Sequence, residues 1–121
     1  MRDGLGGIDI LKKLQFLKNN EEQAINTLRD VLSNKFNLVE LRLFGSKVRG
    51  NDTPDSDIDV MIELAESNPE IVSHIYDILF EINLLNDTFI SAIIFSQKEI
   101  EEGPLSESPI YKIIQKEGVA I

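Results

Sequence analysis

Two aspartates, Asp57 and Asp59, lie two residues apart at the start of a segment that alternates polar and apolar residues. This alternation predicts a β-strand, so both carboxylates project from the same face. Two carboxylates held side by side repel each other unless a cation lies between them. Mg²⁺ favours carboxylate oxygens combined with substrate phosphates and water. The pair therefore predicts a divalent-metal clamp. The alternative interpretation is that both acids are simply solvated or discourage pairing with another strand.

Gly45 and Ser46 stand ten residues upstream of this pair, where a preceding strand is expected to turn. Glycine lets backbone N–H groups approach a phosphate closely, and the serine hydroxyl adds a donor. Lys47 and Arg49 follow and could supply local positive charge. Arg49 has two interpretations of equal weight, which are phosphate binding and pairing with an acid that holds the loop. Together these residues suggest attack on the α-phosphorus of a bound triphosphate, with pyrophosphate leaving.

The spacing of Gly-Ser, ten residues and Asp-x-Asp resembles the signature of the polymerase-β-like nucleotidyltransferase superfamily. Gly-Ser-x-x-Arg-Gly before Ser-Asp-Ile-Asp-Val, and the ending Ser108-Pro109-Ile110-Tyr111-Lys112-Ile113-Ile114 with Glu117-Gly118, are similar to its minimal branch, MNT. The resemblance implies an α+β fold with a small mixed sheet and helices packed on one face. It also implies Mg²⁺ held by Asp57 and Asp59. A nucleoside triphosphate, expected to be ATP, would be bound by Gly45, Ser46 and Arg49.

The resemblance further implies a partner. Members of this branch are commonly encoded beside a small helical HEPN protein and act as its antitoxin, some by transferring AMP to it. The expected function is therefore Mg²⁺-dependent transfer of a nucleoside monophosphate to a protein hydroxyl. The alternative is a domain of the same fold that neutralises or regulates its partner by docking without chemistry. A homo- or hetero-oligomer is compatible with either function.

One position departs from the family pattern. The third carboxylate of the superfamily lies mid-strand, and the position that aligns with it is Ser91. Asp87, at the entrance of that strand, is the nearest acid and the candidate for a third metal ligand. Loss of the third carboxylate removes the usual activator of the attacking hydroxyl and favours the docking alternative.

The order of elements agrees with this reading. Residues 1–20 are expected to form an extension with a short helix over 8–17, and residues 21–121 the nucleotidyltransferase domain. Asn20 is the expected cap of a helix that begins at Glu21. Residues 45–56 are expected to be loop or turn. The remaining elements expected are strands over 38–44, 57–64, 88–95 and 119–121 and helices over 69–85 and 109–116.

The composition of the chain excludes or disfavours several classes of function. The 121 residues include no cysteine, which excludes disulfides and thiolate chemistry, and carry a net charge of −9, which disfavours nonspecific nucleic-acid binding. No apolar run is long enough to span a membrane, so a cytoplasmic location is expected. The helix over 69–85 is unusually apolar near residues 78–85, and we expect it to be buried in part and to form an interface in part.

Overall fold

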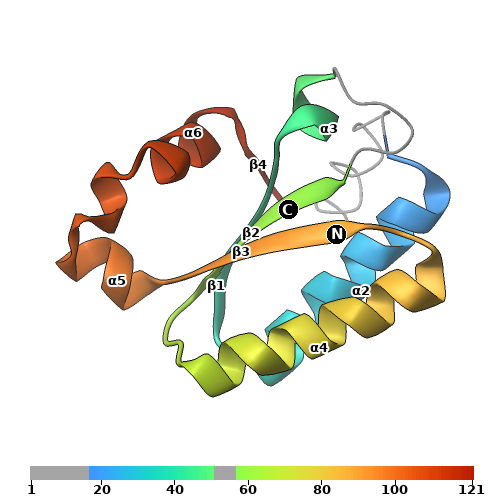
Figure 1. Ribbon diagram of the computed structural model, residues 1–121, viewed down its shortest axis with the longest axis horizontal. Coiled ribbons are helices and arrows are strands. Elements are labelled where there is room, and N and C mark those ends of the chain that lie inside the picture. Colours follow the sequence, from blue (N-terminus) through green and yellow to red (C-terminus); the bar gives the residue numbers. More distant parts are fainter. Residues whose placement is uncertain (1–16, 51–56) are drawn as a thin grey trace, which may run out of the picture.

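The computed structural model describes residues 17–50 and 57–121. Within them, helices and strands alternate along the chain (Figure 1). Their bounds are α2 Asn19–Lys35, β1 Leu38–Phe44, α3 Ser46–Arg49, β2 Ile58–Leu64, α4 Pro69–Asn86, β3 Ile90–Ser96, α5 Gln97–Glu102, the 3₁₀ turn η1 Pro104–Glu107, α6 Pro109–Glu117 and β4 Val119–Ala120.

The strands form one mixed sheet in the order β3-β2-β1-β4. β1 pairs antiparallel with β2 on one side and with β4 on the other. β2 pairs parallel with β3, which requires a crossover, and α4 supplies it. β2 is therefore central and β3 is an edge strand, so the Asp-x-Asp segment lies between two neighbours.

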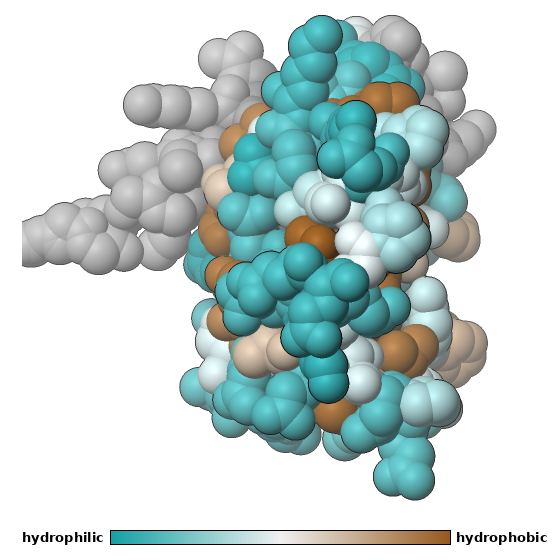
Figure 2. All heavy atoms as spheres, turned by 90° about the vertical axis from the view of Figure 1, so that its left-hand side faces the viewer, coloured by the Kyte–Doolittle hydropathy of each residue, from teal (hydrophilic) through white to brown (hydrophobic). Residues whose placement is uncertain are grey.

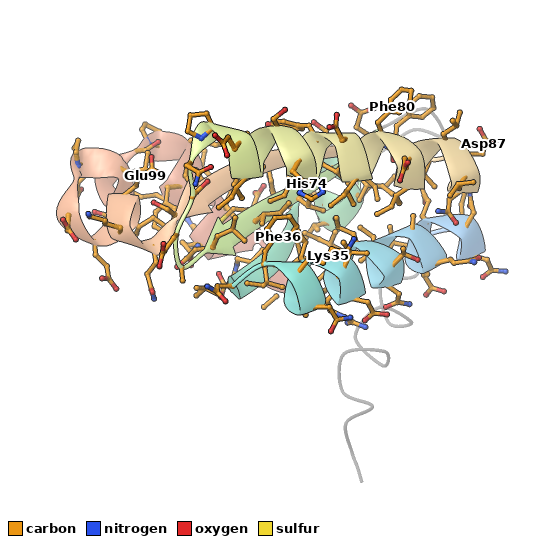
Figure 3. All side chains as sticks on the ribbon, turned by 90° about the horizontal axis from the view of Figure 1, so that it is seen from below. Lys35, Phe36, His74, Phe80, Asp87 and Glu99 are labelled. Carbon is orange, nitrogen blue, oxygen red and sulfur yellow. The ribbon has the colours of Figure 1, made fainter. Side chains whose placement is uncertain are left out.

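The long helices α2 and α4 pack side by side on one face of the sheet (Figures 1 and 3). Alternate residues of β2 point into this layer, and Ile58, Val60 and Ile62 are fully buried there. Leu28 of α2 and Ile75 of α4 close the core from the helix side. The α+β fold with a small mixed sheet is confirmed.

The opposite face carries the other residues of β2, which include Asp59, Met61 and Glu63. Here α5, η1 and α6 contribute a second, smaller apolar cluster in which Met61, Phe95 and Ile114 are buried. Helices on one face only were expected, and this detail was wrong. Because this second layer packs around Met61 rather than Ser91, Ser91 remains exposed.

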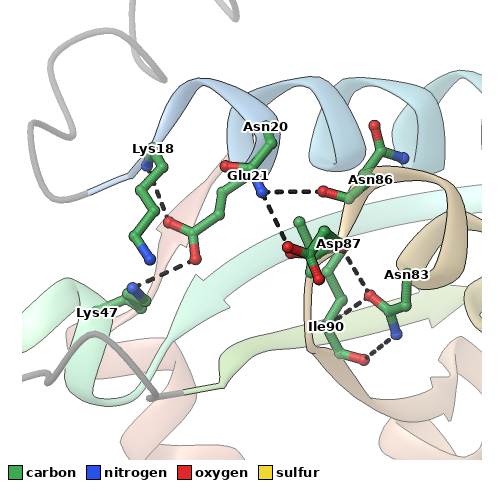
Figure 4. A network of polar contacts seen from close by, with 9 residues as sticks. Lys18, Asn20, Glu21, Lys47, Asn83, Asn86, Asp87 and Ile90 are labelled. Carbon is green, nitrogen blue, oxygen red and sulfur yellow. Dashed lines mark hydrogen bonds and ion pairs between the residues drawn. The ribbon is translucent and has the colours of Figure 1, made fainter.

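Two other local expectations also require correction. Asn20 does not cap α2, because the helix begins at Asn19 after Lys18. Instead, the Asn20 side-chain amide donates to the carbonyl oxygens of Asn86 and Asp87, at 2.9 and 3.2 Å, and ties α2 to the end of α4 (Figure 4).

The segment 45–56 is not loop throughout, because Ser46–Arg49 forms one helical turn, and 51–56 lies outside the described residues. The helix expected over 8–17 also lies outside them, apart from Leu17. Among the helices described, none combines the length and apolarity needed to cross a membrane.

Candidate active site

Gly45 places the end of β1 directly against Asp59. Phe44, the last residue of β1, is in register with Asp59 on β2. Gly45 has φ 82° and ψ −159°, a backbone conformation that is essentially restricted to glycine. A Cβ atom at this position would lie 2.3 Å from Oδ2 of Asp59. Glycine is therefore required here both by the backbone and by the carboxylate that occupies the space.

A single helical turn follows Gly45. The carbonyl oxygen of Gly45 accepts hydrogen bonds from the backbone N–H groups of Val48 and Arg49, at 3.1 and 3.0 Å. Gly50 ends the turn in the left-handed conformation, and its N–H donates to the carbonyl of Ser46 at 3.0 Å. The turn therefore begins where Gly45 lies against the carboxylate of Asp59.

The two aspartates are electrostatically coupled. Burial raises the pKa of Asp59 above the ordinary value, and the neighbouring charge of Asp57 raises it further, whereas the charge of Arg49 lowers it. A carboxylate that is partly desolvated and close to a second carboxylate gains from a bound cation. Two carboxylates at the start of one strand, one of them close to Gly45, provide the oxygen ligands that Mg²⁺ prefers. Asp57 and Asp59 would therefore hold this ion.

Lys47 does not contribute its charge to this site. Its side chain is only 2% exposed, and its Nζ lies 3.3 Å from Oε2 of Glu21 in α2 (Figure 4). Oε1 of Glu21 in turn accepts from the backbone N–H of Lys18 at 2.9 Å. The expectation that Lys47 supplies positive charge for a ligand was therefore wrong. The pair instead fastens the helical turn to α2.

Arg49 pairs with an acid. Its Nη1 lies 2.9 Å from Oε1 of Glu117, near the end of α6, and the Arg49 side chain is 48% exposed. This contact corresponds to one of the two interpretations of Arg49 and connects the motif to the C-terminal helix. Glu117 was not identified as a site residue from the sequence, although Glu117-Gly118 belongs to the ending on which the family resemblance rests.

The position of the third carboxylate is occupied by a hydroxyl. Ser91 on β3 is in register with Asp59 on β2, and its side chain is exposed. Asp87 caps the C-terminus of α4 with φ 55°, ahead of β3. Among the residues described, no three His, Cys, Asp or Glu side chains gather in a way that could hold a metal. Asp87 therefore does not join Asp57 and Asp59 in such a group.

Comparison with known proteins agrees with this geometry. A family model described as a nucleotidyltransferase domain matches residues 25–121, which is most of the chain. The chain belongs to the nucleotidyltransferase domain family. The family is one of transferases.

One curated relative is a protein of Methanocaldococcus jannaschii named as a protein adenylyltransferase. It is 36% identical to this chain over 47 residues. That stretch covers 39% of this chain and 47% of the relative, so the chain matches about half of the relative's length.

Two solved structures are similar to the nucleotidyltransferase domain. One is titled a toxin–antitoxin with AMP-PNP, and it has a TM-score of 0.56 and 17% identity over 85% of this chain and 72% of that one. This likeness supports the shared fold. The other, a nucleotidyltransferase from Sulfolobus solfataricus, is 21% identical over 86% of both chains, with a TM-score of 0.42 that is too low to carry an argument.

Proposed function

We propose that this domain transfers a nucleoside monophosphate, expected to be AMP from ATP, to a hydroxyl group of a partner protein. The observation that carries the proposal is the close apposition of Gly45 to the carboxylate of Asp59, at the turn that the motif predicts for triphosphate binding. The family, and the name of the M. jannaschii relative, support the same chemistry.

Each motif residue has a role in this reaction. Gly45 and Ser46 bind the triphosphate, and Arg49 adds a charge at the rim of the site. Asp57 and Asp59 would hold Mg²⁺, which would supply positive charge to stabilise the triphosphate and the departing pyrophosphate. The hydroxyl oxygen of the acceptor forms a bond to the α-phosphorus, and the bond between the α-phosphorus and the bridging oxygen breaks. Pyrophosphate leaves, and the acceptor carries the nucleoside monophosphate.

The transfer also requires a group that takes up the proton of the acceptor hydroxyl. Ser91 stands in register with Asp59, where a carboxylate could take up the proton, and a serine hydroxyl is not a base at neutral pH. We therefore expect slow transfer unless the acceptor itself supplies a base.

The partner is proposed to be a small helical HEPN-type protein, which this domain would inactivate as its antitoxin. One structural neighbour is a toxin–antitoxin complex by its title, which supports a protein partner. The alternative function is neutralisation of the same partner by docking without transfer, and the serine at position 91 is the observation that favours it.

Incubation with Mg²⁺, α-labelled ATP and extract of the source cells tests the proposal. The matched set contains the wild type, Asp57→Asn, Asp59→Asn and Asp30→Asn. Asp30 is an exposed acid of α2, so the control removes the same charge away from the site. We expect label on one protein band with the wild type and with Asp30→Asn. The two site variants should lose at least about 100-fold of that signal, the size of effect seen when a charge-stabilising group is removed.

Label that persists in both Asp57→Asn and Asp59→Asn would refute the assigned roles. No label with any variant, while the wild type still binds a partner protein, would refute transfer and leave the docking function.

A further inference from the structure

Large apolar side chains are exposed where α4 ends and β3 begins. Phe80 is 68%, Leu84 72% and Phe89 69% exposed. Figure 3 shows Phe80 on the side of α4 that faces away from α2. Leu85 and Tyr76 are exposed as well, and these five residues form what we name the α4 apolar surface. It includes a hollow of about 330 Å³ that is lined by Phe80 of α4 and by Phe89, the residue before β3.

The domain core does not require these side chains. α4 contributes Ile75, Leu79 and Ile82 to the core, and these residues form its buried stripe. Clustered exposed apolar residues of this size mark interaction sites, and aromatic residues dominate the energy of such sites. The α4 apolar surface is therefore best explained by contact with another molecule.

The backbone beside this surface cannot pair with an incoming strand. β3 is an edge strand, but Asn83 of α4 accepts from the N–H of Ile90 at 2.8 Å and donates to its carbonyl at 3.1 Å (Figure 4). The Tyr76 hydroxyl donates to the carbonyl of Ala92 at 3.3 Å. Side chains thus occupy the outward backbone groups of β3 at this end, which protects the edge. Recognition must proceed through side chains, as when a helix packs into an apolar groove.

The charged residues of β2, α4 and β3 are all acidic. Residues 57–97 contain eight Asp or Glu and no Lys or Arg. Of these acids, Asp77, Glu81 and Asp87 are exposed on α4 or at its C-terminus. Two copies of this chain that met through the surface would bring like charges together, which opposes association. A partner with Lys or Arg around its apolar residues would be attracted.

The surface reaches the edge of the sheet, one strand away from the strand that carries Asp59. The carbonyl of Phe89 accepts from the backbone N–H of Ile58 at 2.8 Å, and Ile58 lies between Asp57 and Asp59. Ser91, two residues beyond Phe89, is exposed in register with Asp59. α4 covers the face of the sheet opposite Asp59, so a protein bound at the α4 apolar surface reaches the candidate site by extending around the edge strand β3.

We propose that the α4 apolar surface is the docking site for a protein that presents an apolar helix flanked by Lys and Arg. This inference deepens the proposed function, and rests on it in one respect: the docked protein is the acceptor. A docked protein that extends around the edge strand β3 would place its acceptor hydroxyl over Ser91, on the face of the sheet that carries Asp59.

The opposite end of the molecule provides a matched control. Figure 2 shows that the end formed by α5 and α6 is largely hydrophilic, with apolar atoms in small separate areas. Ile113 of α6 is 47% exposed, so it offers a helical apolar side chain away from the α4 apolar surface.

The first experiment introduces a photo-crosslinking phenylalanine analogue at Phe80 or at Ile113 of the full chain in the source cells. The protein captured from Phe80 is identified and purified, and its affinity for the wild type and for surface variants is measured by calorimetry. We expect Phe80→Ser and Glu81→Lys each to weaken binding about tenfold or more, and Ile113→Ser to change it by less than about twofold. Circular dichroism confirms folding, because substitutions at exposed positions change stability little.

Several results would overturn the docking site. These are equal capture from Ile113, capture of a second copy of this chain, a captured protein without Lys or Arg around an apolar helix, and unchanged affinity of Phe80→Ser. The Asp57→Asn/Asp59→Asn variant separates docking from transfer. If this variant and the wild type bind the captured protein equally and the wild type transfers no label to it, the proposed transfer fails and docking stands. If Phe80→Ser transfers label to the acceptor at the wild-type rate, docking fails and transfer stands.

Discussion

Replacement of Gly45 by alanine tests the central contact of the candidate site. The added methyl group must lie 2.3 Å from Oδ2 of Asp59, so one of the two groups has to move. The carboxylate is the end of a flexible side chain and can rotate away, whereas the backbone is fixed by the hydrogen bonds of the helical turn. Gly45→Ala therefore removes Asp59 from its place without removing its charge.

The expected magnitudes follow from the backbone and from the lost ligand. Forcing a non-glycine residue into this conformation destabilises the protein by about 1–3 kcal/mol. Gly50→Ala is the matched control, because Gly50 also has a positive φ of 80° but nothing lies within 4 Å of its added Cβ. Both variants should lose stability. Only Gly45→Ala should weaken Mg²⁺-dependent nucleotide binding, by at least about tenfold, which corresponds to about 1.4 kcal/mol.

Calorimetric titration of a non-hydrolysable ATP analogue, with and without Mg²⁺, measures this difference, and urea unfolding of each variant reports stability. If Gly45→Ala retains the Mg²⁺-dependent affinity of the wild type, Asp59 is not a metal ligand in the observed position, and the reasoning fails. Equal losses in Gly45→Ala and Gly50→Ala would attribute the effect to strain in the turn rather than to Asp59.

Three further predictions concern neighbouring residues. Lys47→Met should destabilise the protein by about 3–5 kcal/mol because it leaves the buried carboxylate of Glu21 without its cationic partner, while the double variant with Glu21→Met should recover most of this loss in urea unfolding. A loss below about 1 kcal/mol for Lys47→Met would show that solvent screens the pair. Asp59→Asn should stabilise the metal-free protein at neutral pH. The raised pKa of Asp59 disfavours its ionised form in the folded state, and this penalty disappears as the pH falls below the ordinary carboxyl pKa, where both states are protonated. An equal effect of Asp59→Asn at pH 3 and pH 7 would contradict this origin. Ser91→Asp should restore the carboxylate in register with Asp59 and raise the rate of label transfer at least about tenfold, whereas an unchanged rate would show that proton removal does not limit transfer.

Local patterns predicted the elements with good accuracy. The strand over 38–44 has the expected bounds, because alternation with a period of two is a property of the residues themselves. The start of α4 was also predictable. Asn68 accepts from the N–H of Ile71 at 2.9 Å, and proline follows at the first helical position. Such signals act over a few residues, so the chain carries them before it folds.

Local patterns were misleading where one residue type can serve two purposes. Asn20 has the side chain of a helix cap, but its amide is used by carbonyl groups at the end of α4, more than sixty residues away in sequence. Lys47 follows a Gly-Ser pair and has the positive charge to bind a phosphate. In the structure, however, its side chain is buried and paired with Glu21 of α2. One helical turn is too short for periodicity to reveal its buried side.

The motif alone predicted which residues would carry the chemistry, because Gly45, Ser46, Asp57 and Asp59 are defined by type and spacing. Only the tertiary structure decided how they meet. Antiparallel pairing of β1 with β2 brings Gly45 against Asp59, and parallel pairing of β2 with β3 places Ser91 in register with Asp59. Packing of α4 on one face decided which of its apolar residues are buried and which remain exposed beside the site. Strand order, register and burial arise from contacts between distant segments, and the spacing of residues along one chain does not encode them locally.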